Sequence, residues 1–339
     1  MTDNGAGVWC IAENQRGKIA PTVFELITGA RKIAQARGEE VTVVVLGGSG
    51  VAEQADEIAV RGADHVIVLE HEELADFLDE AYTEAIVEIA AKQPPKTILL
   101  PSSVFGRSLA PRLSVALNAG VVSDALELEV DDQKRLIVTR NCYGGNVISK
   151  VALTSATEIV TVRPLAFSRS GTSDKKGALL DMEIDPSSWD VKARFVKFSP
   201  DEGNDVDMGT AEKIVSGGRG LGNAEGFSVI RDLAKTLGAA VGASRAAVDA
   251  GWIPYKHQVG LTGRSVRPRL YIACGISGQI QHLAGMNSSD TIVAINNDPD
   301  CPMMKLATYA VAGDLYKVIP AIISAVEKAR GGAVANAAG

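Results

Sequence analysis

The feature that most constrains the fold is a short apolar run near the end of the chain, followed by glycine and a helical pattern. Residues 270–273 are typical of a buried parallel strand, and Gly275 interrupts the run. Ser277 and Gly278 then open a predicted helix, with His282 just over one turn inside it. The first N–H groups of a helix lack internal partners, so this arrangement predicts an anion site. A titratable ring beside it indicates a cofactor that has both a pyrophosphate and a reactive ring.

Alternating strands and helices extend over the first part of the chain. Apolar runs at residues 8–12, 41–46, 65–69 and 97–100 alternate with helical patterns at residues 21–34, 55–59, 74–92 and 105–118. Short connections between such elements predict a parallel α/β sheet. Runs at residues 126–130, 136–140, 147–153 and 159–162 have few helical signals between them and predict partly antiparallel strands. Residues 167–176 predict an exposed loop, and residues 191–198 alternate and predict a last strand.

An acidic and polar segment, residues 199–208, separates this region from a second α/β pattern. That pattern has strands at residues 213–216, 239–243, 270–273, 291–296 and 309–311, with helices at 227–237 and 315–329. We expect one domain over 1–205, a second over 206–330 and a frayed small-residue tail over 331–339. The length of 339 residues suffices for two domains. The predicted fold is α/β with two doubly wound domains, of which the first has a parallel sheet with added antiparallel strands.

Charge and cysteine content exclude several classes of protein. Lys and Arg number 34 against 41 Asp and Glu, a net charge of −7, which argues against non-specific nucleic-acid binding. The chain lacks a run of about 18 apolar residues and a signal or mitochondrial targeting pattern, so we expect a cytoplasmic, bacterial or archaeal protein that is not membrane-embedded. Four scattered cysteines without C-x-x-C exclude a zinc ribbon, an iron–sulfur cluster and a thioredoxin motif. Cys10 and Cys274 are expected in the core.

Two glycine-rich loops follow predicted strands. Residues 47–50 lack the G-x-G-x-x-G spacing, so a turn that needs positive φ is favoured over a phosphate cradle. Residues 217–222 follow the first strand of the second domain, where doubly wound folds bind dinucleotides. Their spacing differs from the nicotinamide fingerprint, and Arg219 would project a cation toward the strand ends. An ordinary glycine turn explains this loop equally well.

Other predicted strand ends in the second domain also carry polar residues. Ser244 is a candidate N-cap. Arg245 opposes the helix macrodipole unless it faces a bound anion. The polar loop 258–263 lacks an apolar period and is expected to contact a ligand. Asn296 ends a predicted strand, and a turn explains it without a ligand. Asp314 begins a predicted helix, and an N-cap explains it without a ligand. The convergence of these residues indicates a site at one edge of the sheet.

These residues resemble the alpha subunit of electron transfer flavoproteins. The resemblance rests on residues 216–221, 241–252, 258–263, 270–286 and 291–296; it is close over 210–330 and extends to the layout of the first domain. It implies a flavodoxin-like or Rossmann-like FAD-binding C-terminal domain, and an N-terminal domain that contacts an electron transfer flavoprotein beta subunit in a heterodimer. It implies an electron carrier rather than a substrate-converting enzyme. Its donors would be dehydrogenases, commonly of acyl-CoA thioesters in fatty-acid oxidation, and its acceptor a membrane quinone oxidoreductase or another protein.

Carried over residue by residue, the resemblance assigns a cofactor contact to each matching position. Arg219 would lie near the isoalloxazine, and Ser244 and Arg245 would contact the flavin or the pyrophosphate. The ring would be lined by Val259, Gly260, Leu261 and Thr262, with the Thr262 hydroxyl near N5. The pyrophosphate and the pyrimidine edge would be held by Ser277, Gly278, Gln279, Ile280, Gln281 and His282, with His282 near O2. Asn296 and Asp314 would hold the ribose–adenine end, and Leu315 belongs to the same set.

The expected chemistry is electrostatic. Reduction can place negative charge at N1 and the C2 carbonyl of the flavin, and a His donor, a helix N-terminus and Arg side chains favour that charge. The sequence departs from the family at Leu261, where Gln is usual, so the ring loses a polar neighbour and its potential is expected to differ. Gln279, where small residues are common, is a milder departure.

Three alternatives remain open from the sequence. One is a bifurcating version, whose beta subunit holds a second FAD and oxidises NADH; two flavins per heterodimer, rather than one FAD with AMP, would identify it. Another is a nicotinamide-dependent dehydrogenase that uses the loop at residues 217–222 and is colourless when purified. The third is a binding scaffold without a tight cofactor.

Overall fold

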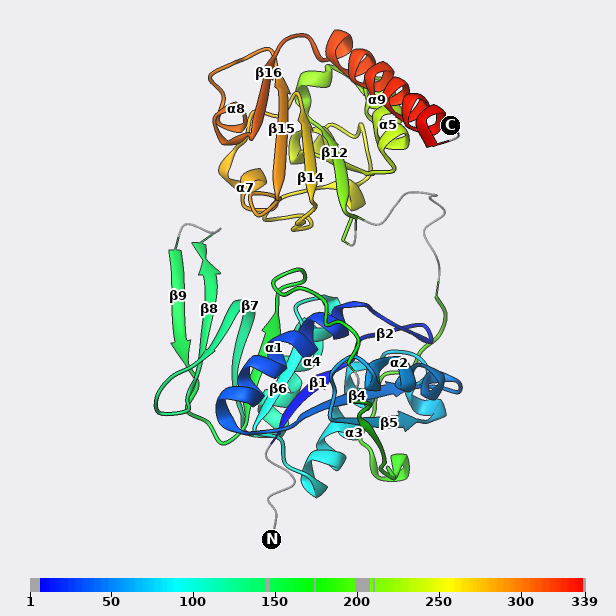
Figure 1. Ribbon diagram of the computed structural model, residues 1–339, viewed down its shortest axis with the longest axis vertical. Helices are drawn as coiled ribbons and strands as arrows, with labels where there is room; N and C mark the ends of the chain where they lie inside the picture. Colours follow the sequence, from blue (N-terminus) through cyan, green and yellow to red (C-terminus); the bar gives the residue numbers. More distant parts are fainter. Residues whose placement is uncertain (1–6, 144–146, 174, 199–207, 210, 338–339) are drawn as a thin grey trace. The chain divides into compact units, whose positions relative to one another are not determined.

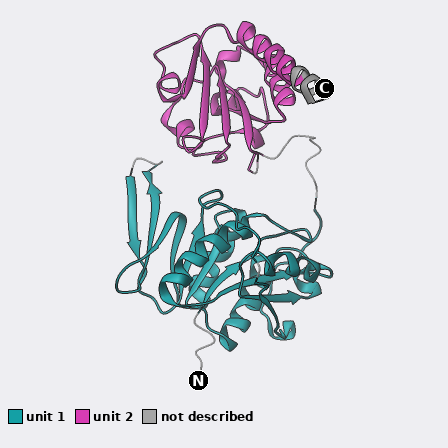
Figure 2. Cartoon of the chain, viewed as in Figure 1, with its two compact units in different colours: residues 1–199 teal, residues 200–339 magenta. Residues whose placement is uncertain are grey.

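The computed structural model describes residues 7–143, 147–173, 175–198, 208–209 and 211–337. The chain divides into two compact units, residues 1–199 and residues 200–339 (Figure 2). Most of the segment 199–208, where the sequence predicts a boundary, lies outside the described residues. Each unit contains its own sheet (Figure 1), so the two are described separately.

The first unit contains a sheet of nine strands in the order β11-β5-β4-β1-β6-β10-β7-β8-β9. Pairing is parallel from β11 to β7, and β8 and β9 are added antiparallel, as the sequence predicted. The strands are β1 (Val8–Ile11), β4 (Val41–Gly47), β5 (His65–Glu70), β6 (Thr97–Pro101), β7 (Gly120–Val130), β8 (Leu136–Cys142), β9 (Val147–Ala152), β10 (Glu158–Val162) and β11 (Ala178–Asp181). A two-residue hairpin pairs β2 (Asn14–Gln15) with β3 (Lys18–Ile19).

Helices cover both faces of this sheet. The amphipathic helix α1 (Thr22–Arg37) packs on one face with α2 (Ala55–Ala59), burying Val23, Leu26 and Ile33 against the strands. On the other face, α3 (Asp79–Lys92) and α4 (Val104–Ala116) bury an aromatic and aliphatic cluster that includes Trp9 and Tyr82. Apolar side chains on both sides are typical of a parallel sheet covered by helices.

The predicted last strand of the first unit is wrong in position. Residues 191–198 form no strand, and their backbone N–H groups at Lys192 and Ala193 donate instead to the Glu80 carboxylate, at 2.7 and 2.9 Å. The edge of the sheet is formed by β11, whose residues pair in parallel with those of β5. Most side chains of residues 191–198 are exposed. The alternation of apolar and polar residues in this segment therefore does not correspond to a strand with one buried face.

The second unit contains a wholly parallel sheet in the order β13-β12-β14-β15-β16. Its strands are β12 (Lys213–Gly217), β13 (Ala240–Ala243), β14 (Leu270–Cys274), β15 (Thr291–Asn296) and β16 (Tyr309–Ala312); its helices are α5 (Phe227–Leu237), α6 (Arg245–Asp249), α7 (Ile280–Leu283), α8 (Pro302–Leu306) and α9 (Leu315–Ala337). Numbered within this unit, the strand order is 2-1-3-4-5, the flavodoxin-like order.

One side of this sheet is covered by α5 and α9, which pack against each other and share a core with Val215, Ile272 and Ile295. The helix α9 continues to Ala337, into the segment 331–339 that we expect to fray. Cys10 and Cys274 are both buried, as predicted, and burial raises the pKa of the Cys274 thiol to about 12.

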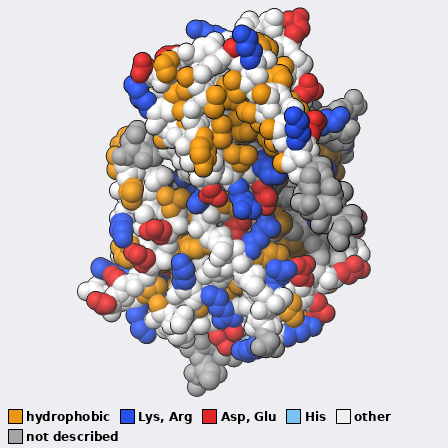
Figure 3. Space-filling view, turned by 45° about the horizontal axis from the view of Figure 1, so that its top comes forward, with side chains coloured by type: hydrophobic (Ala, Val, Ile, Leu, Met, Phe, Trp, Pro, Cys, Tyr) orange, Lys and Arg blue, Asp and Glu red, His pale blue; other side chains and the backbone are white. Residues whose placement is uncertain are grey.

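Charges of both signs are interspersed over the face of the molecule that Figure 3 presents, and hydrophobic side chains gather on the second unit. Among its described residues, this face therefore has no continuous row of positive side chains of the kind that binds the phosphate backbone of a nucleic acid. Among the described residues, no helix has both the length and the apolar character that crossing a membrane requires.

Candidate functional site

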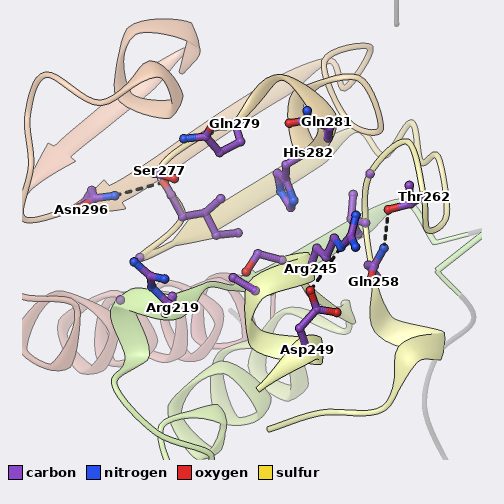
Figure 4. A pocket seen from close by; sticks show the side chains of 18 residues that line it. Arg219, Arg245, Asp249, Gln258, Thr262, Ser277, Gln279, Gln281, His282 and Asn296 are labelled. Carbon is purple, nitrogen blue, oxygen red and sulfur yellow. Dashed lines mark hydrogen bonds and ion pairs between the residues drawn. The ribbon is translucent and has the colours of Figure 1, made fainter. Parts of the chain in front are cut away.

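A cavity of about 660 Å³ opens at the carboxyl ends of β12 and β14 in the second unit. Figure 4 shows Arg219, Arg245 and His282 around it, contributed by three different elements. Its lining comes from the segments that follow four strands and from the loop before β14: Arg219, Gly220, Ser244, Arg245, Ala246, Asp249, Gln258, Val259, Gly260, Thr262, Gly275, Ile276, Ser277, Gly278, Gln279, Gln281, His282 and Asn296.

The strand order explains why a cavity forms at this place. The chain leaves β12 toward β13 on one side, whereas β14, β15 and β16 follow on the other side. The connections that follow β12 and β14 therefore diverge, and the space between them is the topological switch point where α/β sheets bind ligands. Its volume is within the range of small-molecule sites, roughly 300–1,000 Å³.

Backbone packs directly on backbone at the glycine loop after β12. Gly218 N donates to Cys274 O at 2.9 Å, and Gly220 N donates to Gly275 O at 3.0 Å. A Cβ on Gly220 would lie 2.7 Å from the Cα of Gly275. The glycines at these positions are therefore required for close approach, and this approach leaves the Arg219 side chain at the wall of the cavity.

Replacing Gly275 with Ala is expected to lower the free energy of unfolding of the second unit by about 2–3 kcal/mol. Gly275 has φ +64°, and its new Cβ would lie 2.9 Å from Gly220 Cα. Urea unfolding followed by circular dichroism measures the loss. Gly222→Ala is the matched control, because Gly222 has φ +80° and nothing within 4 Å of an added Cβ. Equal losses in both variants would contradict the close approach.

The turn between β14 and α7 offers backbone donors to the cavity. Among the described residues, the N–H groups of Ser277, Gly278 and Gln279 donate no hydrogen bond. Gly275 and Gly278 have φ values of +64° and +84°, and a Cβ on Gly278 would lie 2.4 Å from Met303 N. Successive free N–H groups in such a turn form a concave site for an anion.

The helix expected to begin at Ser277 begins instead at Ile280 and is one turn long. The left-handed conformation of Gly278 is incompatible with a helix, and the Ser277 carbonyl accepts a hydrogen bond from Met303 N at 3.1 Å. His282 therefore lies within the first turn of α7 rather than beyond it. The anion donors belong to a turn and not to a helix N-terminus.

Ser244 caps α6 as predicted, accepting a hydrogen bond from Ala247 N at 3.4 Å. Arg245 Nε lies 3.2 Å from Asp249 Oδ2 one turn later. This exposed ion pair accounts for a cation at a helix start without a bound anion, and the i, i+4 spacing that indicates it is readable in the sequence. Both Arg245 and Asp249 line the cavity.

His282 is the buried titratable group of the cavity, with 6% of the residue exposed. Its Nε2 lies 3.0 Å from the Tyr271 hydroxyl. Nδ1 is shielded from solvent and makes no hydrogen bond of normal geometry with the described residues. Burial lowers the pKa of His282 to about 4, and the nearby Val259 backbone offsets part of that effect. The imidazole is therefore neutral near pH 7.

The structure does not bring every predicted site residue to the cavity. Leu261 and Ile280 are 62% and 67% exposed and lie outside its lining. Asp314 accepts a hydrogen bond from Tyr316 N at 2.9 Å, which is the N-cap role, and Leu315 is buried in the core under α5 and α9.

Two predicted side chains that do line the cavity have partners within the protein. Thr262 Oγ1 accepts a hydrogen bond from Gln258 Nε2 at 3.0 Å. Asn296 Nδ2 donates to Ile276 O at 3.1 Å, and its Oδ1 accepts from Asp298 N at 3.1 Å. Gln258, in the polar loop 258–263, also lines the cavity, and so do Gly220, Ala246, Asp249, Gly275 and Ile276, to which the resemblance assigns no cofactor contact. Apart from the Arg245–Asp249 spacing and the glycines, no sequence signal marks them.

A flavodoxin-like sheet with anion donors, arginines and an imidazole at its switch point defines a dinucleotide-binding α/β protein. The family model of the electron transfer flavoprotein domain matches residues 8–187, and that of the electron transfer flavoprotein FAD-binding domain matches residues 207–287. The chain is 41% identical to the electron transfer flavoprotein subunit alpha of Thermoanaerobacterium thermosaccharolyticum, over 95% of this chain and 98% of that one. The chain therefore belongs to the family of electron transfer flavoprotein alpha subunits.

Other relatives agree with this assignment. The chain is 40% identical to the probable electron transfer flavoprotein subunit alpha, mitochondrial, of Caenorhabditis elegans, over 93% of this chain and 92% of that one. It is 37% identical to Protein FixB of Clostridium saccharobutylicum, over 94% and 95% of the two chains. It is a flavoprotein of electron transport whose cofactor is FAD.

The residues of the cavity fit FAD. The free N–H groups of Ser277, Gly278 and Gln279 suit a pyrophosphate, and Arg219 makes no ion pair with the described residues. Gly260, at φ +143°, lets the loop around residue 259 lie against α7, because a Cβ there would be 2.8 Å from Gln281 O. An apolar wall at Val259 and Ile276 suits a flat ring.

Proposed function

We propose that this chain is the electron-carrying subunit of a heterodimer with an electron transfer flavoprotein beta subunit. Its donors are dehydrogenases of the acyl-CoA or a related type, and its acceptor is a membrane quinone oxidoreductase or another redox protein. Bound FAD supplies the redox chemistry. The observation that carries the proposal is one cavity that combines a neutral buried imidazole with Arg219 and backbone donors that have no partner among the described residues.

Each group has a role in this proposal. Arg245 and the N–H groups after β14 would hold the pyrophosphate, and Arg219 would lie near the isoalloxazine. Val259 and Thr262 lie along the ring, and His282 holds a proton close to its pyrimidine edge. Fixed donors in a site shielded from water stabilise negative charge better than mobile water does. Asn296 orients the ribose–adenine end of the cofactor. Leu261 is exposed and outside the cavity lining, and it adds apolar surface in place of the usual amide.

Purification with the partner subunit tests the function. The chain is co-expressed with its beta subunit, and the flavin and AMP contents are measured after denaturation. One FAD and one AMP per heterodimer support the carrier. Two FAD per heterodimer indicate the bifurcating alternative, in which the beta subunit holds the second flavin. A colourless heterodimer that cannot be reconstituted with FAD overturns both.

The variant His282→Ala is expected to lower the potential of the first electron step by roughly 60–120 mV, the equivalent of one hydrogen bond to a charged group. The reason is the loss of a donor from the pyrimidine edge of the ring. Spectroelectrochemical titration of the reconstituted heterodimer measures the change. His71→Ala in the first unit is the control, and an unchanged potential in His282→Ala would remove His282 from the proposed role.

A further inference from the structure

The loop that precedes β14, residues 258–264, contributes to the cavity wall and is fixed by its own backbone. Gly260 N donates to Arg264 O at 3.1 Å, and Arg264 N donates to Gln258 O at 2.8 Å. Leu261 N donates to Gln281 O at 2.7 Å, which fastens the loop to α7. These hydrogen bonds set the conformation of the loop before any ligand binds.

Thr262 is held at two atoms within this loop. Tyr255 donates from its hydroxyl to Thr262 O. Gln258 donates from Nε2 to Thr262 Oγ1 at 3.0 Å, as Figure 4 shows. Gln258 is only 3% exposed, whereas Thr262 is exposed at the cavity wall. A buried amide thus orients an exposed hydroxyl, which would otherwise rotate among several positions.

The glycine after Thr262 makes room for this amide. A Cβ on Gly263 would lie 2.3 Å from Gln258 O and 2.9 Å from Gln258 Cγ. A larger residue at this position would therefore displace the side chain of Gln258 from its place against the loop.

The direction of the hydrogen bond determines what Thr262 offers to a ligand. A hydroxyl has one proton and two lone pairs. The Gln258 amide occupies a lone pair, and among the described residues the Thr262 hydroxyl donates no hydrogen bond. Its proton is therefore available for donation into the cavity. An amide that donates to the hydroxyl oxygen also strengthens donation by the hydroxyl.

The composition of the segment 259–262 makes this hydroxyl more important. Val259, Gly260 and Leu261 have no polar side chain, and Leu261 stands where Gln is usual in the family. The backbone N–H of Leu261 already donates to Gln281 O. Thr262 is therefore the side chain of this segment that is able to donate a hydrogen bond to the ring.

We propose that Gln258 is a positioning residue, which holds the Thr262 hydroxyl so that its proton points at an acceptor atom of the cofactor. The inference rests on the function proposed above, because the acceptor belongs to FAD. A donor that is oriented beforehand does not have to be ordered when the ligand binds, and it stabilises negative charge on the ring. Gln258 acts through Thr262 and not by a contact of its own with the cofactor.

Nuclear magnetic resonance of the cofactor-free full chain tests the hydrogen bond. The side-chain amide signals of Gln258 are assigned in ¹⁵N-labelled protein by their loss in Gln258→Met. We expect them to shift in Thr262→Val, which removes the acceptor, and to stay close to their original positions in Thr262→Ser, which retains it. Amide signals that are the same in Thr262→Val as in the unmodified chain overturn the proposal.

Redox titration of the FAD-loaded heterodimer tests the positioning. Gln258→Met keeps the length of the side chain and removes the amide. We expect it to lower the first-electron potential by a twofold to tenfold change in the reduction equilibrium, about 18–59 mV for one electron. In the Thr262→Val background the same change should have no further effect, because Gln258 acts through Thr262. Equal shifts in both backgrounds, or no shift in either, overturn the proposal.

Further variants separate positioning from a general loss of structure. Gln258→Leu should give the same shift as Gln258→Met, and it serves in its place if the Met variant does not fold. Gln54→Leu is the control, since it removes an amide that donates to Gly17 O at 2.6 Å in the first unit, and it is expected to leave the potential unchanged. A heterodimer that binds no FAD would overturn the proposed function and the role of Thr262 toward FAD. The hydrogen bond measured in the cofactor-free chain would then still stand.

Discussion

Replacing Glu158 with Leu is expected to lower the free energy of unfolding of the first unit by about 3–5 kcal/mol. Arg37 Nη1 lies 2.8 Å from Glu158 Oε2, and the two side chains are only 3% and 2% exposed. The carboxylate also accepts from Arg37 Nη2 at 3.0 Å and from the Thr97 hydroxyl at 2.7 Å. The variant would leave the Arg37 guanidinium buried at the C-terminal end of α1 without its carboxylate partner.

Urea unfolding of the full chain, read as separate transitions for the two units, measures this loss. Glu129→Leu is the matched control, because Glu129 forms an ion pair with Lys150 at 3.0 Å in which both side chains are more than half exposed. Exposed pairs contribute about 0–1 kcal/mol. The double variant Arg37→Met with Glu158→Leu should recover part of the loss, since it leaves no unpaired buried charge. A single variant as stable as the control would contradict this account.

The second unit is expected to lose about 3 kcal/mol of stability from His282 alone as the pH falls from 6.5 to 4. Burial lowers the pKa of His282 to about 4 in the folded chain, against 6.5 as the ordinary value. The unfolded chain therefore binds the proton more readily over that interval. Stability is fully present above pH 6.5 and is lost progressively as the pH falls through the folded value.

The difference between the unmodified chain and His282→Gln isolates this contribution from the carboxylates that titrate in the same range. Urea unfolding at pH 7, 6, 5 and 4.5 gives the free energy of unfolding of each protein. We expect the values for the unmodified chain and for His282→Gln to converge as the pH falls. The reason is that Gln does not titrate, whereas a protonated His282 must either leave its place beside Tyr271 or remain buried with a charge. Parallel curves over the whole interval would show that His282 is solvated in the folded chain.

The elements were largely predictable because their signals are local. Periodicity of apolar residues placed α5 at 227–237 and β15 at 291–296, the bounds that the structure shows. It also separated the parallel region from the antiparallel strands β8 and β9. The strand β11 was missed because a short edge strand depends on pairing with β5, which is more than a hundred residues away in the chain.

The candidate site was predictable in part. Polar residues and glycines at successive strand ends were readable, and parallel pairing brings strand ends to one edge. The resemblance assigns Leu261, Ile280, Asp314 and Leu315 to the site as well, but they are not among the residues that line the cavity. Their placement depends on how each loop packs on its neighbour.

The sequence by itself determined two α/β units and the segments that would meet at one edge of the second sheet, because strand and helix periodicity are properties of neighbouring residues. Tertiary structure alone decided that the anion donors lie in a turn, that Gly220 and Gly275 touch backbone to backbone, and that Tyr271 reaches His282. These contacts join separate strands and loops. Their energies depend on distance and burial, which arise only when the chain is folded.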